Sequence, residues 1–199
     1  MKEMKSAIEK RRSCYSLSAQ SPITNSEIKE LIDCAVLHIP SAFNSQSTRT
    51  VLLLEGQHQK FWELVKDELK KVVAPAAFHT TKEKIEQSFQ AGYGTVLFYE
   101  DQRIVKSLQE QFPRYRANFP VWSEHTSAMH QLAVWMLLGE VGFGASLQHY
   151  NPLIDEVVAK TWNISSEWKM IAQMPFGLPL IEPGEKSMEP LDSRSLMFD

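Results

Sequence analysis

Two adjacent arginines and a serine, Arg11, Arg12 and Ser13, are the first residues in the chain whose types could do chemistry together. Guanidinium groups bind phosphate oxygens through paired hydrogen bonds and a serine hydroxyl adds another, so the trio could hold one phosphate monoester. The preceding residues 4–11 follow helical spacing, and arginines at a helix C-terminus also offset the helix dipole and keep a surface solvated. Composition alone favours this second role.

A second polar group occupies the segment Pro40–Gln46, whose sequence is PSAFNSQ. Its hydroxyl and amide side chains include Ser41, Asn44 and Gln46. An amide places a donor beside an acceptor, which suits the edge of a heterocycle that presents both. The same residue types are common in turns, so ordinary turn chemistry explains the segment nearly as well.

Two later segments could add to such a site. Gly142–Ser146 (GFGAS) resembles a dinucleotide fingerprint only weakly, because the third glycine is absent and the segment follows a helix. We expect its glycines to allow a tight turn or a close approach to a flat ligand. Lys186 and Arg194, near the C-terminus, are candidates for completing a remote anionic site, with solvated surface charge as the alternative.

Composition narrows the class of protein. The chain has 199 residues, of which 43% are hydrophobic and 23% charged, with a net charge of −3. These values are typical of one soluble globular domain and disfavour a general nucleic-acid or acidic-membrane binder. The longest apolar run, residues 132–138, is too short to cross a bilayer, and the start lacks a signal peptide, so we expect a cytoplasmic protein.

Several classes of chemistry lack a sequence signal. The two cysteines, Cys14 and Cys34, are isolated and the six histidines lack metal-ligand spacing, so no metal site is expected. There is no nucleophile elbow, P-loop or cysteine-protease signature. The chain therefore shows no self-contained acid–base or covalent catalyst.

Hydrophobic periodicity predicts the elements that must position these residues. Thr24 and Glu27 have capping-box spacing before a helix that ends at Pro40. The other expected helices cover about residues 61–72, 81–92 and 120–140, and one from Asn151-Pro152 through Val158; the expected buried strands cover residues 50–54, 95–99 and 169–175.

The longest helical pattern, 120–140, is expected to be central. Its predicted buried side consists of small and apolar residues: Ala128, Leu132, Trp135, Met136 and Gly139.

The C-terminal segment 177–199 is rich in proline and glycine and cannot form one regular element. It nevertheless contains large apolar residues from Leu178 to Phe198. A free tail would not need such side chains, so we expect an arm that packs on its own core or on another subunit. The chain is thus one domain, 1–199, with 177–199 as an extended arm.

Five segments, taken in this order, resemble the nitroreductase family of flavin-dependent oxidoreductases. They are AIEKRRSCYSL, IPSAFNSQSTRTVLL, QAGYGTVLFYED, HQLAVWMLLGEVGFGASLQHYNPLID and GLPLIEPGEKSMEPL. The resemblance covers essentially the whole chain. The last two segments are most similar to the short branch that includes the fungal fatty-acid-repression-mutant proteins and their bacterial relatives.

The resemblance implies an α+β fold in which helices flank a small central mixed or antiparallel sheet. It also implies a homodimer with two FMN at the subunit interface and C-terminal arms exchanged between subunits. The implied activity is that of an FMN-dependent NAD(P)H oxidoreductase. Hydride passes from NADH or NADPH to flavin N5 and then to a nitroaromatic or quinone, in a ping-pong scheme. Because the cofactor does the difficult chemistry, no catalytic side chain is expected.

The family's motifs also imply roles for particular residues. Arg11, Arg12 and Ser13 match the RxS motif that holds the FMN phosphate and the pyrimidine side of the flavin. Tyr15 stands where larger members carry a basic residue, and its hydroxyl could still donate to the flavin O2 edge.

The remaining cofactor-binding residues implied by the resemblance come from three further segments. They are Ser41, Asn44 and Gln46, which usually reach the flavin from the partner subunit; Ser146, Leu147 and Gln148, near N5; and Lys186 and Arg194, as a phosphate clamp from the C-terminal region. Possible lid aromatics are Phe43, Phe112, Tyr115 and Phe119, for which core packing is the alternative.

Two other classes of function remain open at this point. The chain could be a flavin-binding regulatory or stress-response protein with low turnover, because it lacks much of the helical lid of larger members. It could also be a helical interaction protein without a cofactor, for which the docked tail and the tryptophan content would suffice.

Overall fold

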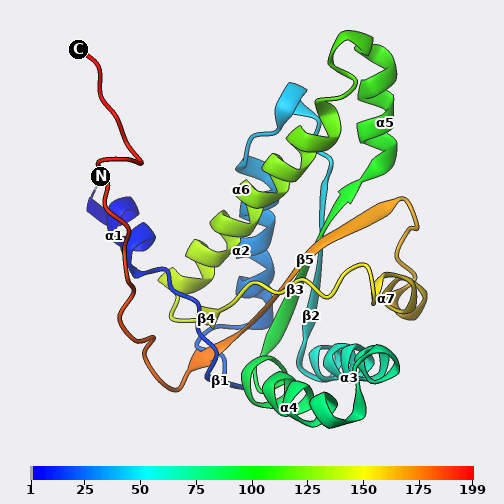
Figure 1. The fold of residues 1–199 in the computed structure, drawn as a ribbon, viewed down its shortest axis with the longest axis vertical. Helices are drawn as coiled ribbons and strands as arrows, with labels where there is room; N and C mark the ends of the chain where they lie inside the picture. The colour runs from blue at the N-terminus through cyan, green and yellow to red at the C-terminus, as the bar shows by residue number, and fades with distance from the viewer. Residues whose placement is uncertain (1) are drawn as a thin grey trace.

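The computed structural model describes residues 2–199 and shows helices on both faces of an antiparallel sheet (Figure 1). The helices are α1 (Lys2–Lys10), α2 (Asn25–His38), α3 (Glu55–Val72), α4 (Pro75–Ile85), α5 (Gln102–Gln111), α6 (Phe119–Glu140) and α7 (Asp155–Trp162). The strands are β1 (Leu17–Ser18), β2 (Thr48–Leu54), β3 (Gly94–Asp101), β4 (Gly144–Ala145) and β5 (Trp168–Pro179). The predicted α+β class is confirmed, with an antiparallel sheet.

The sheet order is β1-β5-β3-β2, and the short β4 also pairs with β5. At one end of the sheet Glu100 of β3 lies between Thr48 and Lys169, and at the other end Gly94 lies between Leu54 and Phe176. β1 and β4 both join this second end, where β4 pairs with Phe176 and Gly177. At about 3.3 Å per residue, the six steps from Gly94 to Glu100 separate the two ends by roughly 20 Å.

Two hydrophobic cores lie on the two faces of the sheet. Val96 and Phe98 of β3 face α2 and α6, whereas Leu97 and Tyr99 face α3 and α7. This alternation is the period of two expected of a strand. All of β3 is buried because helices cover both faces, and this explains why residues 96–99 form an uninterrupted apolar run.

The start and end of α2 confirm the sequence prediction. The Thr24 hydroxyl accepts a hydrogen bond from the Glu27 N–H at 3.3 Å, and the Glu27 carboxylate accepts one from the Thr24 N–H at 2.7 Å. These contacts satisfy N–H groups that a helix start leaves without partners. The helix ends at His38, before Pro40.

The predicted buried face of α6 is wrong. Ala128, Leu132 and Gly139 are exposed, with 48% of Leu132 accessible, and Trp135 is only half-buried; of the predicted stripe, Met136 is buried. The core side instead carries Ser127 and Gln131, together with His130, Val134 and Leu138. The Gln131 amide donates to the Ser127 hydroxyl at 3.0 Å, so these two buried polar side chains pair with each other. Because α6 is apolar on two sides, periodicity could not identify the inner one.

Two other elements differ from the sequence prediction. Helix α5 was not predicted because its sequence is largely polar and it buries only Val105. Asp101 caps it by accepting a hydrogen bond from the Arg103 N–H at 3.1 Å. Asn151-Pro152 lies in a turn and not at a helix start, and α7 begins at Asp155, which places two acidic residues in its first turn.

The C-terminal segment lies along the outside of the molecule, beyond β5 and past α1 (Figure 1). The Leu180 N–H donates to the Ser16 carbonyl at 2.9 Å. Large apolar side chains of this segment are exposed: Leu180, Ile181, Met188, Leu191, Leu196, Met197 and Phe198. The segment therefore does not pack on its own core. None of the helices within residues 2–199 has the length and apolar character needed to cross a bilayer.

Candidate functional site

The Arg11–Ser13 segment lies beside β4, at the sheet end that carries β1. Ser13 forms a parallel bridge with Ala145, and the Cys14 N–H donates to the Ala145 carbonyl at 2.9 Å. Gly144 permits this approach, because a Cβ there would lie 2.8 Å from the Cys14 Cβ. Gly142 has φ +95°, so it makes the tight turn that its sequence predicted.

The segment Ser146–Gln148 continues from β4 along the edge of β5. The Ser146 N–H donates to the Pro175 carbonyl at 3.2 Å, and the Gln148 N–H donates to the Gln173 carbonyl at 2.7 Å. Because N–H groups alternate in direction along an extended chain, the intervening Leu147 N–H points away from β5. It donates no hydrogen bond within the described part of the chain. A backbone donor is thus left for a ligand beside Arg11–Ser13.

Arg11 and Arg12 line a cavity of about 550 Å³. The Arg11 guanidinium lies 4.5 Å from the centre of the Trp135 ring, and Arg12 Nη2 donates to the Gly184 carbonyl at 2.7 Å. Lys10 also lines this cavity, as do the acidic residues Glu9, Glu140 and Glu182. Because these charges nearly balance, a phosphate here would depend on direct contacts with the arginines and not on a strong positive field.

The other residues predicted at this end are differently placed. Tyr15 is 51% exposed and its ring centre lies 6.4 Å from that of Phe89. Lys186 and Arg194 both lie in the exposed C-terminal segment. Arg194 donates to the Glu189 carbonyl at 3.4 Å, within that same segment. Among residues 2–199, neither cation forms a hydrogen bond with the Arg11–Ser13 segment.

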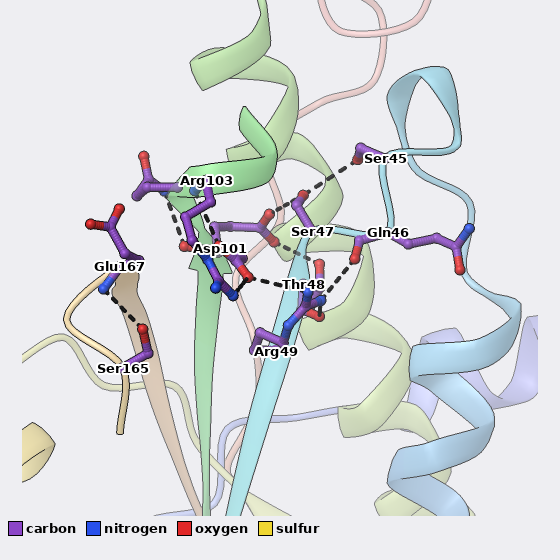
Figure 2. Close-up of polar contacts among 11 residues, drawn as sticks. Ser45, Gln46, Ser47, Thr48, Arg49, Asp101, Arg103, Ser165 and Glu167 are labelled. Atoms are coloured by element: carbon purple, nitrogen blue, oxygen red, sulfur yellow. Dashed lines mark hydrogen bonds and ion pairs between the residues drawn. The ribbon is translucent and has the colours of Figure 1, made fainter. Parts of the chain in front are cut away.

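The PSAFNSQ segment lies at the opposite end of the sheet, just before β2. Within it Phe43, Asn44 and Gln46 have φ of 55°, 50° and 49°. The Ser41 hydroxyl accepts a hydrogen bond from the Gln46 N–H at 2.9 Å, so this serine closes the loop. The Asn44 and Gln46 side chains are exposed, and Gln46 points away from β2 and β3 (Figure 2). Both amides are therefore available to a ligand or a partner.

The predicted lid aromatics gather around Phe43. The ring centre of Phe43 lies 4.9 Å from that of Phe112, 5.8 Å from Tyr115 and 5.3 Å from Phe119. Trp122, which the sequence reasoning did not include, stacks on Phe43 at 5.9 Å with a 19° angle between the planes. Phe43 and Trp122 also line an apolar cavity of about 360 Å³ with His125 and Met129.

Two buried carboxyl groups lie next to this loop, where β2 begins and β3 ends. Glu100 accepts hydrogen bonds from the Ser47 hydroxyl at 2.5 Å and the Thr48 hydroxyl at 2.6 Å, and burial raises its pKa. The neighbouring Asp101 is contacted by Arg103 at 2.8 Å and by Arg49 at 3.3 Å. The Arg103 hydrogen bond is the main cause that holds the pKa of Asp101 below its ordinary value.

The sequence reasoning missed this network. Arg49 and Asp101 are 52 positions apart, and their only local signal is charge at the ends of two apolar strands.

The two groups of candidate residues do not meet within one chain. The Arg11 group lies at the end of the sheet where Gly94 pairs with Phe176, and the Asn44 group lies at the end where Thr48 pairs with Glu100. Figure 1 shows the loop before β2 and the β1–β4 region at opposite ends of the sheet. The site expected from the sequence is therefore divided into two halves.

The comparisons with known proteins all match nitroreductases. A model of the nitroreductase family matches residues 8–178. The putative nitroreductase HBN1 of Saccharomyces cerevisiae is 34% identical over 179 residues, which are 89% of this chain and 88% of that protein. The nitroreductase FRM2 of the same yeast is 31% identical over 183 residues, 91% of this chain and 90% of that protein.

Two solved structures are informative. Nitroreductase CinD from Lactococcus lactis, in complex with nicotinic acid, is 43% identical with a TM-score of 0.91, covering 98% of this chain and all (100%) of that chain. A nitroreductase from Desulfitobacterium hafniense with bound FMN has a TM-score of 0.71 at 13% identity, with full (100%) coverage of both chains. The second likeness concerns the fold alone.

Proposed function

Because the chain belongs to the nitroreductase family, we propose that it is an FMN-dependent oxidoreductase that passes electrons from NADH or NADPH to nitroaromatics or quinones. Family membership makes it an oxidoreductase of the nitroreductase type. The observation that carries the finer proposal is the outward N–H of Leu147 beside the Arg11–Ser13 segment. A free backbone donor next to paired guanidiniums and a hydroxyl suits a flat ring that carries a phosphate.

The residues at this end fit FMN in their donor chemistry. Arg11, Arg12 and Ser13 would hold the phosphate and the pyrimidine side, and the Ser146–Gln148 backbone would lie against the ring. Tyr15 is exposed, and its hydroxyl would donate to the O2 edge of the flavin. Bound FMN would supply the two-electron chemistry, which explains why the chain needs no catalytic acid or base of its own. The chain's task is to bind and orient the cofactor and to exclude water.

The remaining donors would come from a second copy of the chain. Asn44 and Gln46 are exposed at the far end of the sheet and would reach the flavin of the partner. Ser41 would act indirectly, because its hydroxyl closes the loop that carries them. Lys186 and Arg194 would complete the phosphate site from the C-terminal arm.

Two uncovered apolar surfaces support a homodimer. One is the outer face of α6, where Val121, Met129 and Leu132 are exposed. The other is the arm 177–199, whose large apolar side chains from Leu180 onwards find no cover on their own chain. Surfaces of this kind are typical of subunit interfaces. We propose that the arms are exchanged between subunits and bury these residues.

The aromatic group around Phe43 supports a planar substrate. Phe43 and Trp122 present stacked, partly exposed rings beside an apolar cavity. Aromatic faces bind planar rings by offset stacking. The Lactococcus lactis relative has been solved with nicotinic acid and also with 4-nitrophenol, which are both small aromatic molecules.

Isolation of the protein tests the proposal directly. We expect it to be yellow and to release FMN, not FAD, on denaturation, because no adenylate-binding motif is present. NADH or NADPH should bleach the flavin and a quinone should restore its colour. Protein that stays colourless after incubation with FMN would contradict the proposal. Bound FMN without turnover would favour the regulatory, low-turnover alternative.

A further inference from the structure

The loop that carries Asn44 and Gln46 has an uncommon backbone. Phe43, Asn44 and Gln46 are all in the left-handed region. Asparagine tolerates this region, whereas phenylalanine and glutamine seldom adopt it, and such positions persist only where surrounding contacts hold them. Hydrogen bonds inside the loop include those from the Asn44 and Ser45 N–H groups to the Ser41 and Ala42 carbonyls. None of the hydrogen bonds inside the loop reaches the Gln46 carbonyl, so support for this group has to come from outside the loop.

Arg49 provides a contact of this kind. Its Nη1 donates to the Gln46 carbonyl at 2.8 Å and to the Thr48 carbonyl at 3.0 Å. Its Nη2 donates to Asp101 Oδ2 at 3.3 Å. Figure 2 shows Arg49 between the Gln46 main chain and Asp101, while the Gln46 side chain extends in the opposite direction. One guanidinium thus joins the left-handed residue to a buried carboxylate on the neighbouring strand.

Asp101 is well placed to orient Arg49. It is completely buried (0% exposed), and its own N–H donates to the Ser47 carbonyl at 2.9 Å. Its Oδ1 accepts hydrogen bonds from the Arg103 main-chain N–H and from Arg103 Nε, both at 3.1 Å. A carboxylate fixed by this many donors cannot turn away, so the Arg49 fork is fixed as well.

We propose that Arg49, oriented by Asp101, is a positioning residue that holds the Phe43–Gln46 loop in the conformation that presents the Asn44 and Gln46 amides to the partner's flavin. The inference rests on the proposed function, in which those two amides contact FMN. Arg49 itself does not need to touch the cofactor. Lysine cannot replace it, because an ammonium lacks the planar fork that reaches two carbonyls and a carboxylate together.

Arg103 is a matched control for Arg49. Both guanidiniums contact Asp101 Oδ2, but Arg103 forms no hydrogen bond with residues 41–46. Arg49→Ala and Arg103→Ala each remove one positive charge from the same carboxylate. A general electrostatic effect on flavin or on NADH would be shared by the two variants, whereas a loop effect would be confined to Arg49.

The test measures the FMN dissociation constant by flavin fluorescence for the full-length wild type, Arg49→Ala, Arg49→Lys, Arg103→Ala and Asn44→Ala. We expect both Arg49 variants to bind FMN at least about tenfold more weakly, as misplaced contacts do. Asn44→Ala should show a comparable loss. Arg103→Ala should stay within about twofold of wild type, because Asp101 keeps its hydrogen bonds with the Arg103 main-chain N–H and with Arg49. The visible absorption band of flavin bound to Arg49→Lys should shift towards that of free FMN, which a loss of stability alone would not cause.

The outcomes separate the two proposals. A wild type that binds no FMN would overturn the proposed function. A wild type that binds FMN while Arg49→Ala binds equally well would overturn the positioning role of Arg49 and leave the function intact. Should Arg49→Ala fail to fold, as judged by thermal unfolding of the flavin-free protein, Arg49→Lys decides by the same criterion. Equal losses in Arg49→Lys and Arg103→Ala would also overturn the inference.

Discussion

The two halves of the candidate site are built in different ways. At the Arg11 end, main-chain pairing places the residues, because Ser13, Ser146 and Gln148 are all bonded through their backbones to β4 or β5. At the Phe43 end, side chains do this, because a left-handed loop is tied to Arg49. A backbone scaffold tolerates side-chain changes, whereas a side-chain network depends on particular residues. The two halves should therefore respond differently to mutation.

The largest effect is expected from removing the arm, on which both halves depend if a second copy joins them. Deletion of residues 180–199 leaves β5 complete but removes the exposed apolar residues that follow it. We expect monomer, aggregate or flavin-free protein, because the arm would contribute much of a dimer interface. Sedimentation and the flavin absorbance measure this. A stable yellow dimer of the deletion variant would show that the arm is dispensable.

Acid should destabilise the fold through its buried histidines, which are His58 near the Arg11 end and His130, which contacts Thr48 at the Phe43 end. His58 bonds Thr95, whose sheet partner Pro175 accepts the Ser146 hydrogen bond, so His58 supports the Arg11 half. Burial lowers the pKa of His58 from 6.5 to about 4. The unfolded chain then binds more protons between these values, and stability falls by about 3 kcal/mol as the pH drops from 6.5 to 4.

Asp101 acts in the same direction but at lower pH, because its lowered pKa means that its stabilising contribution is lost only as the pH falls below its ordinary value of 3.8. Urea unfolding at pH 7 and at pH 4.5 measures how much the free energy of unfolding falls between these two pH values. His58→Gln should remove much of the pH dependence, and His79→Gln, on the exposed surface, should not. If the free energy of unfolding of His58→Gln falls with pH as much as that of the wild type, the acid sensitivity belongs to other groups.

At the Arg11 end, the Arg11 side chain is expected to contribute directly to FMN affinity. Arg11→Ala is expected to weaken FMN binding by about 1.5–3 kcal/mol, the range for hydrogen bonds to charged groups. Lys10→Ala, at the end of α1 and lining the same cavity, is the control and should change affinity little. Equal affinity of Arg11→Ala and wild type would reduce Arg11 to a helix-end charge.

The smallest effect is expected at His149, which follows the Ser146–Gln148 segment and is exposed. His149→Gln should leave the rate of flavin reduction nearly unchanged, because this chemistry belongs to the cofactor. Initial-rate plots at several acceptor concentrations should be parallel, since donor and acceptor would use one site in turn. Intersecting plots would indicate a ternary complex, and an inactive His149→Gln that still binds FMN would reveal a proton donor.

Local patterns in the sequence predicted most of the fold. Thr24 and Glu27 marked the start of α2, and the apolar runs marked β2, β3 and β5 because their residues are covered by helices. Patterns failed for two helices. The buried face of α6 was ambiguous because this helix is apolar on two sides, and α5 was missed because it has almost no buried stripe.

The sequence identified the segments of the candidate site but not their arrangement. Arg11–Ser13 and Gly142–Gln148 were separate predictions, and they are joined by the pairing of Ser13 and Cys14 with Ala145. The contact between Arg49 and Asp101 depends on the register of β2 against β3, in which Arg49 pairs with Tyr99. Register is a property of the assembled sheet and leaves no local signal in either strand.

The central claim, that each flavin is held by two halves from different chains, can be tested with one mixed dimer. Arg11→Ala and Asn44→Ala chains are co-expressed with different tags, and the dimer that carries both tags is isolated. If the halves come from different chains, one site receives both substitutions and the other receives none, so the account predicts one FMN per dimer bound with wild-type affinity. If both halves belong to one chain, each site carries one substitution, and a mixed dimer without any wild-type site would contradict the account.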